Sequence, residues 1–142
     1  MPAKAIMFPV LALALWTMLV LLLIPFVRVR AGRRREVKVG DFRYGESASV
    51  PPRVSIPNRN YMNLLEVPVL FYVACIVAFI AGGVTPAALG LAWAFVALRV
   101  VHSAIHLTYN NVIHRLAVFA AANVVLVFLL LGVLQRLLES QA

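Results

Sequence analysis

Four long apolar runs constrain this chain more than any other feature, because they occupy most of its 142 residues. The first run, residues 6–27, carries no charged side chain. It is long enough to cross a hydrocarbon core of ~30 Å at a rise of ~1.5 Å per residue. Three further runs follow, at residues 61–82, 85–108 and 112–138. The sequence therefore predicts an all-α membrane protein, a four-transmembrane-helix bundle.

Composition supports this interpretation and limits the domain count. The chain is 63% hydrophobic and 13% charged, whereas a soluble domain is nearer half apolar. Its length predicts a single membrane domain over residues 1–142. A signal peptide is the competing interpretation of the first run, but the basic leader holds only Lys4 and no small-residue cleavage site follows. The single cysteine, Cys75, excludes a disulfide framework and a cysteine metal motif.

Positive charge is concentrated between the first two runs. Nine of the 13 Lys and Arg residues lie in the segment 28–60. By the positive-inside rule this segment is a cytoplasmic loop, so both termini lie on the outer side. The pattern indicates a topology signal that also contacts anionic lipid headgroups, with one or two substrate-facing arginines as the alternative, and it does not indicate a nucleic-acid domain. Five residues predict that no long helix forms in this loop: Gly40, Gly45, Pro51, Pro52 and Pro57.

Ionisable side chains inside the apolar runs are the candidate functional residues, because such groups cost several kcal/mol near the bilayer centre. Arg99, His102 and His106 share one stripe of the third span, and Tyr109 falls close to it. Arg59, Asn63 and Glu66 form a similar stripe at the start of the second span, and Arg115 opens the fourth. The predicted topology brings all of these to one depth near the cytoplasmic interface. One pocket is therefore expected to collect Arg59, Asn63, Glu66, Arg99, His102, His106, Tyr109 and Arg115.

Such a pocket suits a small anionic ligand that also carries an ammonium group. Arginine pairs bidentately with carboxylates, and Glu66 is placed either to meet the ammonium or to hold an arginine. An arginine beside a thiol favours the thiolate, but the pocket has no cysteine, so the thiol would arrive with the ligand. Glutathione has these groups, although the residues alone do not single it out. A purely structural ion pair at Glu66 is the alternative.

A metal or haem site is the less favoured interpretation of the histidines. His102 and His106 have helical i, i+4 spacing, and His114 lies across the next turn. No acidic residue stands beside them in sequence, and two ligands on one helix cannot bind a haem from both faces. Hydrogen bonding to Glu66 or to backbone carbonyls is the more ordinary role. We therefore predict no metal.

Two motifs give the chain a family resemblance. The first is Arg59-x3-Asn63-x2-Glu66-x-Pro68, and the second is Arg99-x2-His102 followed by Arg115. Together with the four spans and the basic loop, they resemble the MAPEG family, the membrane-associated proteins in eicosanoid and glutathione metabolism. The runs NRNYMNLLEVPVLFY and HSAIHLTYN are more similar to a bacterial branch than to the eicosanoid enzymes. His106 stands where characterised members usually carry a tyrosine.

The resemblance implies a homotrimer in the bacterial inner membrane, with both termini periplasmic and glutathione bound between subunits near the cytoplasmic face. Arg59, Asn63, Glu66 and His102 would position glutathione, with Arg28 as a further contact. Arg115 would be the catalytic, thiolate-stabilising residue, and Arg99 would hold the pocket together. The implied function is that of a glutathione-dependent transferase or peroxidase acting on a lipophilic small molecule from the bilayer. The alternatives are a non-catalytic membrane scaffold and a protein that binds an anionic lipid or metabolite.

Overall fold

The computed structural model describes residues 3–139 of the chain. These residues form helices and turns, with one isolated β-bridge between Arg43 and Gly45. In chain order the elements are the 3-10 helix η1 (Ala3–Ile6), α1 (Met7–Arg33), the 3-10 helix η2 (Val39–Phe42), α2 (Pro52–Leu65), α3 (Pro68–Ile80), α4 (Pro86–Leu107) and α5 (Val112–Glu139).

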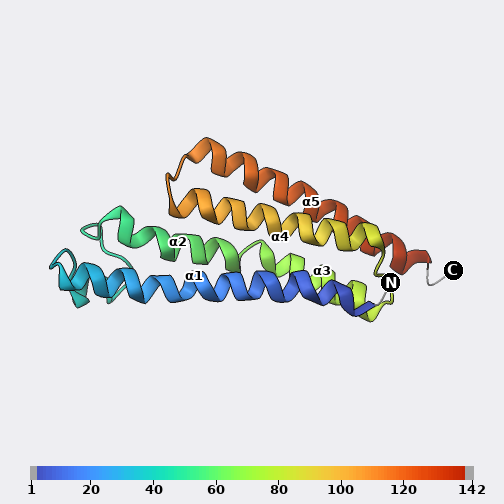
Figure 1. Cartoon of the computed structure of the whole chain (residues 1–142), viewed down its shortest axis with the longest axis horizontal. Helices are drawn as coiled ribbons and strands as arrows, with labels where there is room; N and C mark the ends of the chain where they lie inside the picture. The colour runs from blue at the N-terminus through green and yellow to red at the C-terminus, as the bar shows by residue number, and fades with distance from the viewer. Residues whose placement is uncertain (1–2, 140–142) are drawn as a thin grey trace.

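The membrane-spanning segments number four within residues 3–139. By length and composition they are Ala3–Arg33, Pro52–Ile80, Pro86–Leu107 and Val112–Glu139. The start of α1 and the end of α5 lie at one end of the bundle, and the α1–α2 loop and the α4–α5 turn point toward the other (Figure 1). The prediction of an all-α, four-span integral membrane protein is confirmed.

Two helices extend further into the basic loop than the sequence predicted. The first helix continues past residue 27 to Arg33, and α2 begins at Pro52 instead of residue 61. Pro52 occupies the first helical turn, where its fixed φ is favourable and its missing N–H has no helical partner to lose. Pro57 lies inside the helix, where its missing N–H removes one backbone hydrogen bond, but the helix continues past it. The loop proper is therefore shorter than the predicted segment 28–60.

The second span is divided in two beside its polar stripe. Glu66 ends α2 with φ −83° and ψ −95°, outside helical geometry, and α3 starts two residues later at Pro68. Proline has no N–H for the carbonyl of Leu64, so the helical hydrogen-bond ladder is interrupted here, although Val67 itself keeps helical dihedral angles. The interruption exposes backbone groups at the depth where the polar side chains gather.

The core lies along the middle of the bundle and is made of large apolar side chains. Leu13, Leu64, Phe71, Phe95 and Leu129 are all buried, so every span contributes to it. The rings of Phe71 and Phe95 stack with centroids 4.7 Å apart and planes at 17°. The outward faces of α1 and α5 carry many exposed apolar side chains, which is the surface expected against lipid tails.

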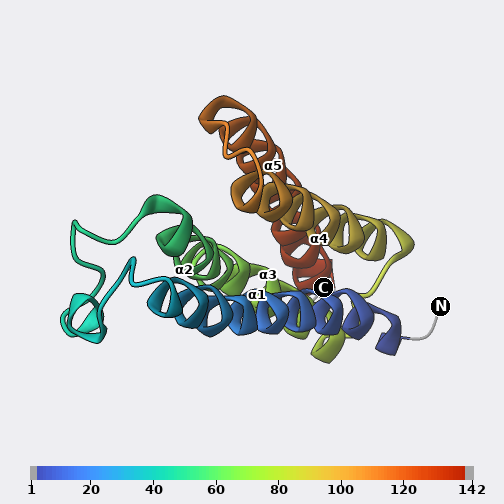
Figure 2. The ribbon, with the colours of Figure 1, turned by 60° about the vertical axis from the view of Figure 1, so that its left-hand side comes forward.

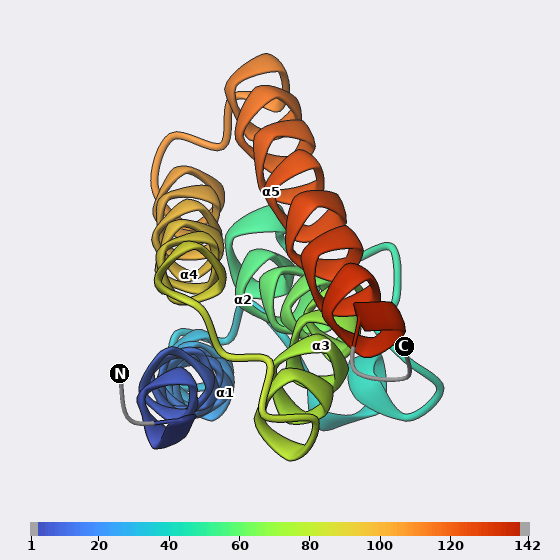
Figure 3. The same cartoon turned by 90° about the vertical axis from the view of Figure 1, so that its right-hand side faces the viewer.

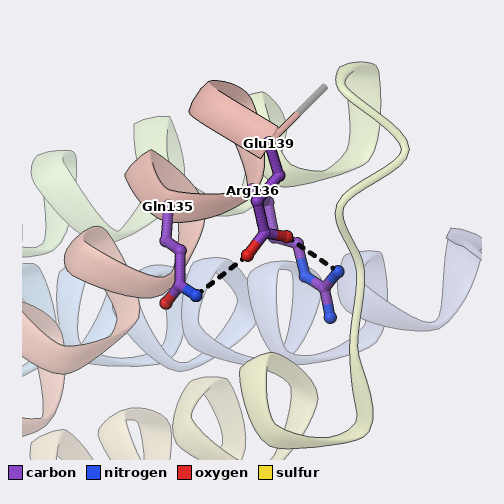
Figure 4. A network of polar contacts seen from close by, with 3 residues as sticks. All are labelled: Gln135, Arg136 and Glu139. Atoms are coloured by element: carbon purple, nitrogen blue, oxygen red, sulfur yellow. Dashed lines mark hydrogen bonds and ion pairs between the residues drawn. The ribbon is translucent and has the colours of Figure 1, made fainter. Parts of the chain in front are cut away.

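The end of the bundle where α3 leads into α4 closes with a tight turn and a small polar network. The chain leaves α3 through Gly82, whose φ of +65° favours glycine, and Gly83 N–H bonds the carbonyl of Ala78 at 2.9 Å. At the end of α5, Arg136 donates to Glu139 at 3.1 Å, and Gln135 donates to the same carboxylate at 2.9 Å (Figure 4). This network lies at the opposite end of the molecule from the candidate site.

The last helix crosses the others instead of running parallel to them. It packs along α4 and meets α3, while its first turns stand apart from α2 (Figures 2 and 3). Side chains of α2, α4 and the start of α5 line the space between these elements. The polar residues of three spans thus border a common space near the end of the bundle that holds the α1–α2 loop and the α4–α5 turn (Figure 1).

Candidate functional site

The inner third of α4 carries three basic side chains that are withdrawn from the surface. Arg99, His102 and His106 are buried, as the helical spacing predicted for residues sharing one face. The two imidazole rings meet edge to face with centroids 5.9 Å apart. The ring of Phe119 on α5 lies 6.1 Å from His102. This stripe forms the floor of the site.

Arg99 ties α4 to the interrupted second span. Its guanidinium Nη2 donates to the backbone carbonyl of Asn63, three residues before the helix break at Glu66. The same guanidinium lies 5.7 Å from the centroid of the Phe119 ring. The arginine therefore caps a carbonyl next to the helix break and connects three elements, α2, α4 and α5. Such a contact fits the structural role that the resemblance implied for it.

The turn between α4 and α5 positions Arg115. Asn110 adopts φ +49°, a left-handed conformation that asparagine tolerates better than most residues. Its side-chain Oδ1 accepts a hydrogen bond from Arg115 Nη1 at 2.8 Å. The Oδ1 of Asn111 accepts from the N–H groups of Ile113 and His114, which caps the start of α5. The turn thus fixes both the helix start and the direction of the Arg115 side chain.

Two neighbouring hollows lie between α2, α4 and α5. The first has a volume of about 340 Å³ and the second about 240 Å³, and Asn63 and Arg115 line both. The first is of the size at which small-molecule pockets begin, ~300 Å³. Its lining consists of Ile56, Asn58, Arg59, Met62, Asn63, Glu66, His106, Asn110 and Arg115. The second is lined by Asn63, His102, Val112, Arg115, Leu116 and Phe119.

The structure brings most of the predicted site residues together. The first hollow holds five of them and the second adds His102, while Arg99 lies behind the wall that Asn63 forms. Two others lie elsewhere. Arg28 donates to Glu46 at 2.9 Å and packs on the ring of Phe42, and Tyr109 is exposed with its hydroxyl 3.1 Å from His114 Nδ1. Within one chain, neither side chain lines the hollows.

Several lining residues were missed by the sequence reasoning. Asn110 is not among the predicted site residues, and its hydrogen bond to Arg115 gives it a role at the site. Phe119 lies one helical turn after Arg115, so the i, i+4 spacing indicates that the two side chains share one face of the helix. Ile56 and Asn58 were assigned to the loop and became lining residues only because α2 begins early.

Unpaired buried polar atoms surround the hollows. Glu66 forms no ion pair in the described part of the chain, where the three ion pairs are Arg28–Glu46, Arg53–Glu36 and Arg136–Glu139. Burying a donor without a partner costs about 1–3 kcal/mol, so a cluster of such donors indicates a place built for a polar ligand. The atoms concerned are Arg99 Nε and Nη1, His102 Nδ1, His106 Nδ1 and Arg115 Nε. Among residues 3–139, no group of three or more His, Cys, Asp or Glu side chains is arranged to hold a metal ion.

The loop between α1 and α2 is folded against the end of α1. Val37, Val50 and Val54 pack with Ala31 in a small apolar cluster. The side chain of Arg53 bonds the Glu36 carboxylate at 2.6 Å and holds its pKa below the usual value. At Asp41, hydrogen bonds from the Lys38 backbone and two serine hydroxyls likewise lower the pKa of the carboxyl. These contacts shape the loop beside the site.

Comparison with known proteins decides the family. A model of the MAPEG family matches residues 6–135, which covers all four spans and both motifs. The chain belongs to the MAPEG family. No curated protein and no solved structure matches it. MAPEG membership confirms the predicted family, which includes glutathione transferases and peroxidases as well as members without catalytic activity.

Proposed function

We propose that this MAPEG protein binds glutathione in the space between α2, α4 and α5, and directs its thiolate at a lipophilic electrophile dissolved in the bilayer. The observation that carries the proposal is the cluster of unpaired buried donors around hollows that Arg59, Glu66 and Arg115 border. Arginines suit the two carboxylates of glutathione, and Glu66, which has no ion pair among the described residues, suits its ammonium group.

Each polar residue then has a distinct task. Arg59, Asn63 and Glu66 bind the peptide, and the histidines supply hydrogen-bonding groups from the floor. Arg115 stabilises the thiolate, because a fixed positive charge favours the charged form of a nearby thiol. Asn110 and Arg99 act as positioning residues, the first through Arg115 and the second through the α2 backbone.

The reaction is a thiol transfer or a peroxide reduction. In the transfer, the thiol proton leaves to solvent, the sulfur electron pair forms a bond to an electrophilic carbon, and the leaving group departs with its own pair. In the reduction, the thiolate attacks the terminal hydroperoxide oxygen, the O–O bond breaks, and the sulfur is left as a sulfenic acid while the alkoxide leaves and takes a proton from solvent to form an alcohol. A second glutathione then converts the resulting sulfenic acid to the disulfide and water. Both reactions need a thiolate beside a bilayer-facing opening.

A homotrimer in the bacterial inner membrane, with both termini periplasmic, completes the proposal. The hollows are open on one side, and a neighbouring copy packed there would close them against lipid. Arg28 and Tyr109, which point away from the hollows of their own chain, would then be available to a site shared between copies. The basic loop sets the orientation by the positive-inside rule.

Equilibrium binding tests the proposal directly. Glutathione is titrated into the detergent-solubilised protein by calorimetry, and saturable binding is expected. Replacement Arg59→Ala removes charge-assisted hydrogen bonds worth about 1.5–3 kcal/mol and should weaken binding about 10- to 100-fold. Arg136→Ala is the matched control, because that arginine pairs with Glu139 at the opposite end of the protein (Figure 4).

Three results would contradict the proposal or one of its residue roles. Absence of saturable binding by the unaltered protein would favour the scaffold interpretation, in which the polar residues serve packing alone. Full turnover of a chloronitroarene or a lipid hydroperoxide by Arg115→Ala would remove the catalytic role of that residue. Loss of assembly without loss of binding in a Glu66→Gln variant would likewise favour a purely structural role for the carboxylate.

A further inference from the structure

A second basic site lies outside the bundle, at the cytoplasmic end of α1. The helix continues for six residues beyond the apolar run, and its end reaches further than those of α4 and α5 (Figure 1). A groove of about 760 Å³ runs along this end and is lined by Pro25, Phe26, Val29, Arg30, Arg33 and Arg34. Its volume exceeds that of either hollow at the candidate functional site.

The groove is apolar at one end and cationic at the other. Phe26 and Val29 are 62% and 55% exposed, so their side chains present apolar surface to the surroundings. Positions 26, 30 and 33 follow the helical i, i+4, i+7 spacing and share one face. At ~1.5 Å per residue, the backbone positions of the three arginines lie ~6 to ~12 Å beyond Phe26 along the helix axis. This span matches the headgroup layer, ~5–8 Å thick on each side of the hydrocarbon core.

The three arginines of the groove form no ion pair in the described part of the chain, although the charges of Arg30 and Arg34 lie near enough to Glu36 to help lower the pKa of its carboxyl. Three other arginine side chains of the loop are engaged: Arg28 with Glu46, Arg53 with Glu36, and Arg43 over the ring of Tyr44. Arg35 and Arg59 form no such contact within residues 3–139, but they do not line this groove. No ion pair, side-chain hydrogen bond or ring contact involves the guanidinium group of Arg30, Arg33 or Arg34 within residues 3–139. The carboxylate nearest in sequence, Glu36, is bound to Arg53 at 2.6 Å.

We propose that this groove binds an anionic phospholipid of the cytoplasmic leaflet. The phosphate is held by the guanidinium groups of Arg30, Arg33 and Arg34, which match phosphate oxygens bidentately. The start of an acyl chain lies along Pro25, Phe26 and Val29. A second, smaller groove of about 290 Å³ shares Phe26, Arg30 and Arg34 and continues toward Arg53 and Glu36. The headgroup has room on the side of the folded loop, where Arg53 is paired with the Glu36 carboxylate.

Charge complementarity selects this occupant. A zwitterionic lipid brings an ammonium group among the three arginines, whereas an anionic lipid brings a phosphate without a compensating charge. A soluble phosphate leaves the exposed side chains of Phe26 and Val29 in water. The site is separate from the glutathione pocket proposed above, because the two share no lining residue.

Native mass spectrometry of the full-length protein tests the proposal. Retention of phosphatidylglycerol is compared with that of phosphatidylcholine of the same chain length, in a nonionic detergent. The triple variant R30Q/R33Q/R34Q should lose about 100-fold in phosphatidylglycerol affinity, at about fivefold for each arginine. The control R35Q/K38Q/R43Q removes the same charge from loop residues that do not line the groove, and it should retain the lipid.

Three results would overturn the assignment. Equal loss in the two triple variants would mean diffuse attraction without a site. Unchanged lipid retention with an altered oligomeric state in R30Q/R33Q/R34Q would mean that a second copy of the chain occupies the groove. Displacement of phosphatidylglycerol by equimolar glycerol phosphate would mean that the apolar end contributes nothing. Circular dichroism of each variant verifies that the helices are intact.

Discussion

Replacing Asn110 separates the two roles of this residue. Its side chain holds Arg115 through a 2.8 Å hydrogen bond, and its backbone adopts φ +49°. Glycine accepts that backbone conformation without strain but cannot hold Arg115, whereas alanine both loses the bond and strains the turn. The pair Asn110→Gly and Asn110→Ala therefore distinguishes positioning of the arginine from stability of the turn.

The magnitudes follow from the geometry. A hydrogen bond to a charged group contributes about 1.5–3 kcal/mol, and partial exposure of this one reduces the value to about 1 kcal/mol. A left-handed alanine costs a further ~1 kcal/mol relative to glycine. The free energy of unfolding of Asn110→Gly should thus lie within about 1 kcal/mol of that of the unaltered protein. The free energy of unfolding of Asn110→Ala should be about 1 kcal/mol lower than that of Asn110→Gly.

Two assays read the two effects. Unfolding by SDS titration in mixed micelles measures stability, and calorimetry measures glutathione binding. Both variants should weaken binding to a similar extent, about 5- to 10-fold, because both release Arg115. Full affinity in Asn110→Gly together with a loss in Arg115→Ala would refute the reasoning, because Arg115 would then find its position without Asn110.

Three further predictions concern stability. The pKa values of Glu36 and Asp41 are lowered in the folded loop. The two carboxylates therefore stabilise the folded loop at neutral pH, and this stabilisation is lost as pH falls below the ordinary pKa values of 4.5 and 3.8. Protease cleavage of the loop should increase at that pH, and the variant Asp41→Asn should show increased cleavage already at pH 7. Gly82→Ala should destabilise the protein by about 1 kcal/mol in SDS titration, because φ is +65° there, and an unchanged midpoint would contradict this. Phe71→Ala should cost about 3–5 kcal/mol by the same assay, since the ring is fully buried against Phe95.

Much of the fold was predictable because apolar runs of membrane-spanning length leave few alternatives. The ends of the third and fourth spans were also predicted closely, since Thr85 and Pro86 begin one helix and Asn111 caps the next. The start of the second span was not predicted closely, because a proline indicates the end of a helix unless it is known to lie in the first helical turn. Local sequence does not reveal that position.

The site was predictable where helical spacing decides it. The stripe containing Arg99, His102 and His106 follows from the periodicity alone, and all three are buried. The placements of Arg28 and Tyr109 depend on partners that periodicity cannot show, namely Glu46 on the folded loop and His114 after the turn. The basic groove depends on which arginines stay unpaired, and only the folded loop determines that.

The break at Glu66 gives the second span two rigid arms joined by a pivot. Its long arm carries Arg59, ~10 Å from the pivot at ~1.5 Å per residue. A swing of about 6° therefore carries that arginine through ~1 Å, enough to make or break a hydrogen bond. The other arm is held by the stacked rings of Phe71 and Phe95, so such motion leaves the middle of the membrane undisturbed.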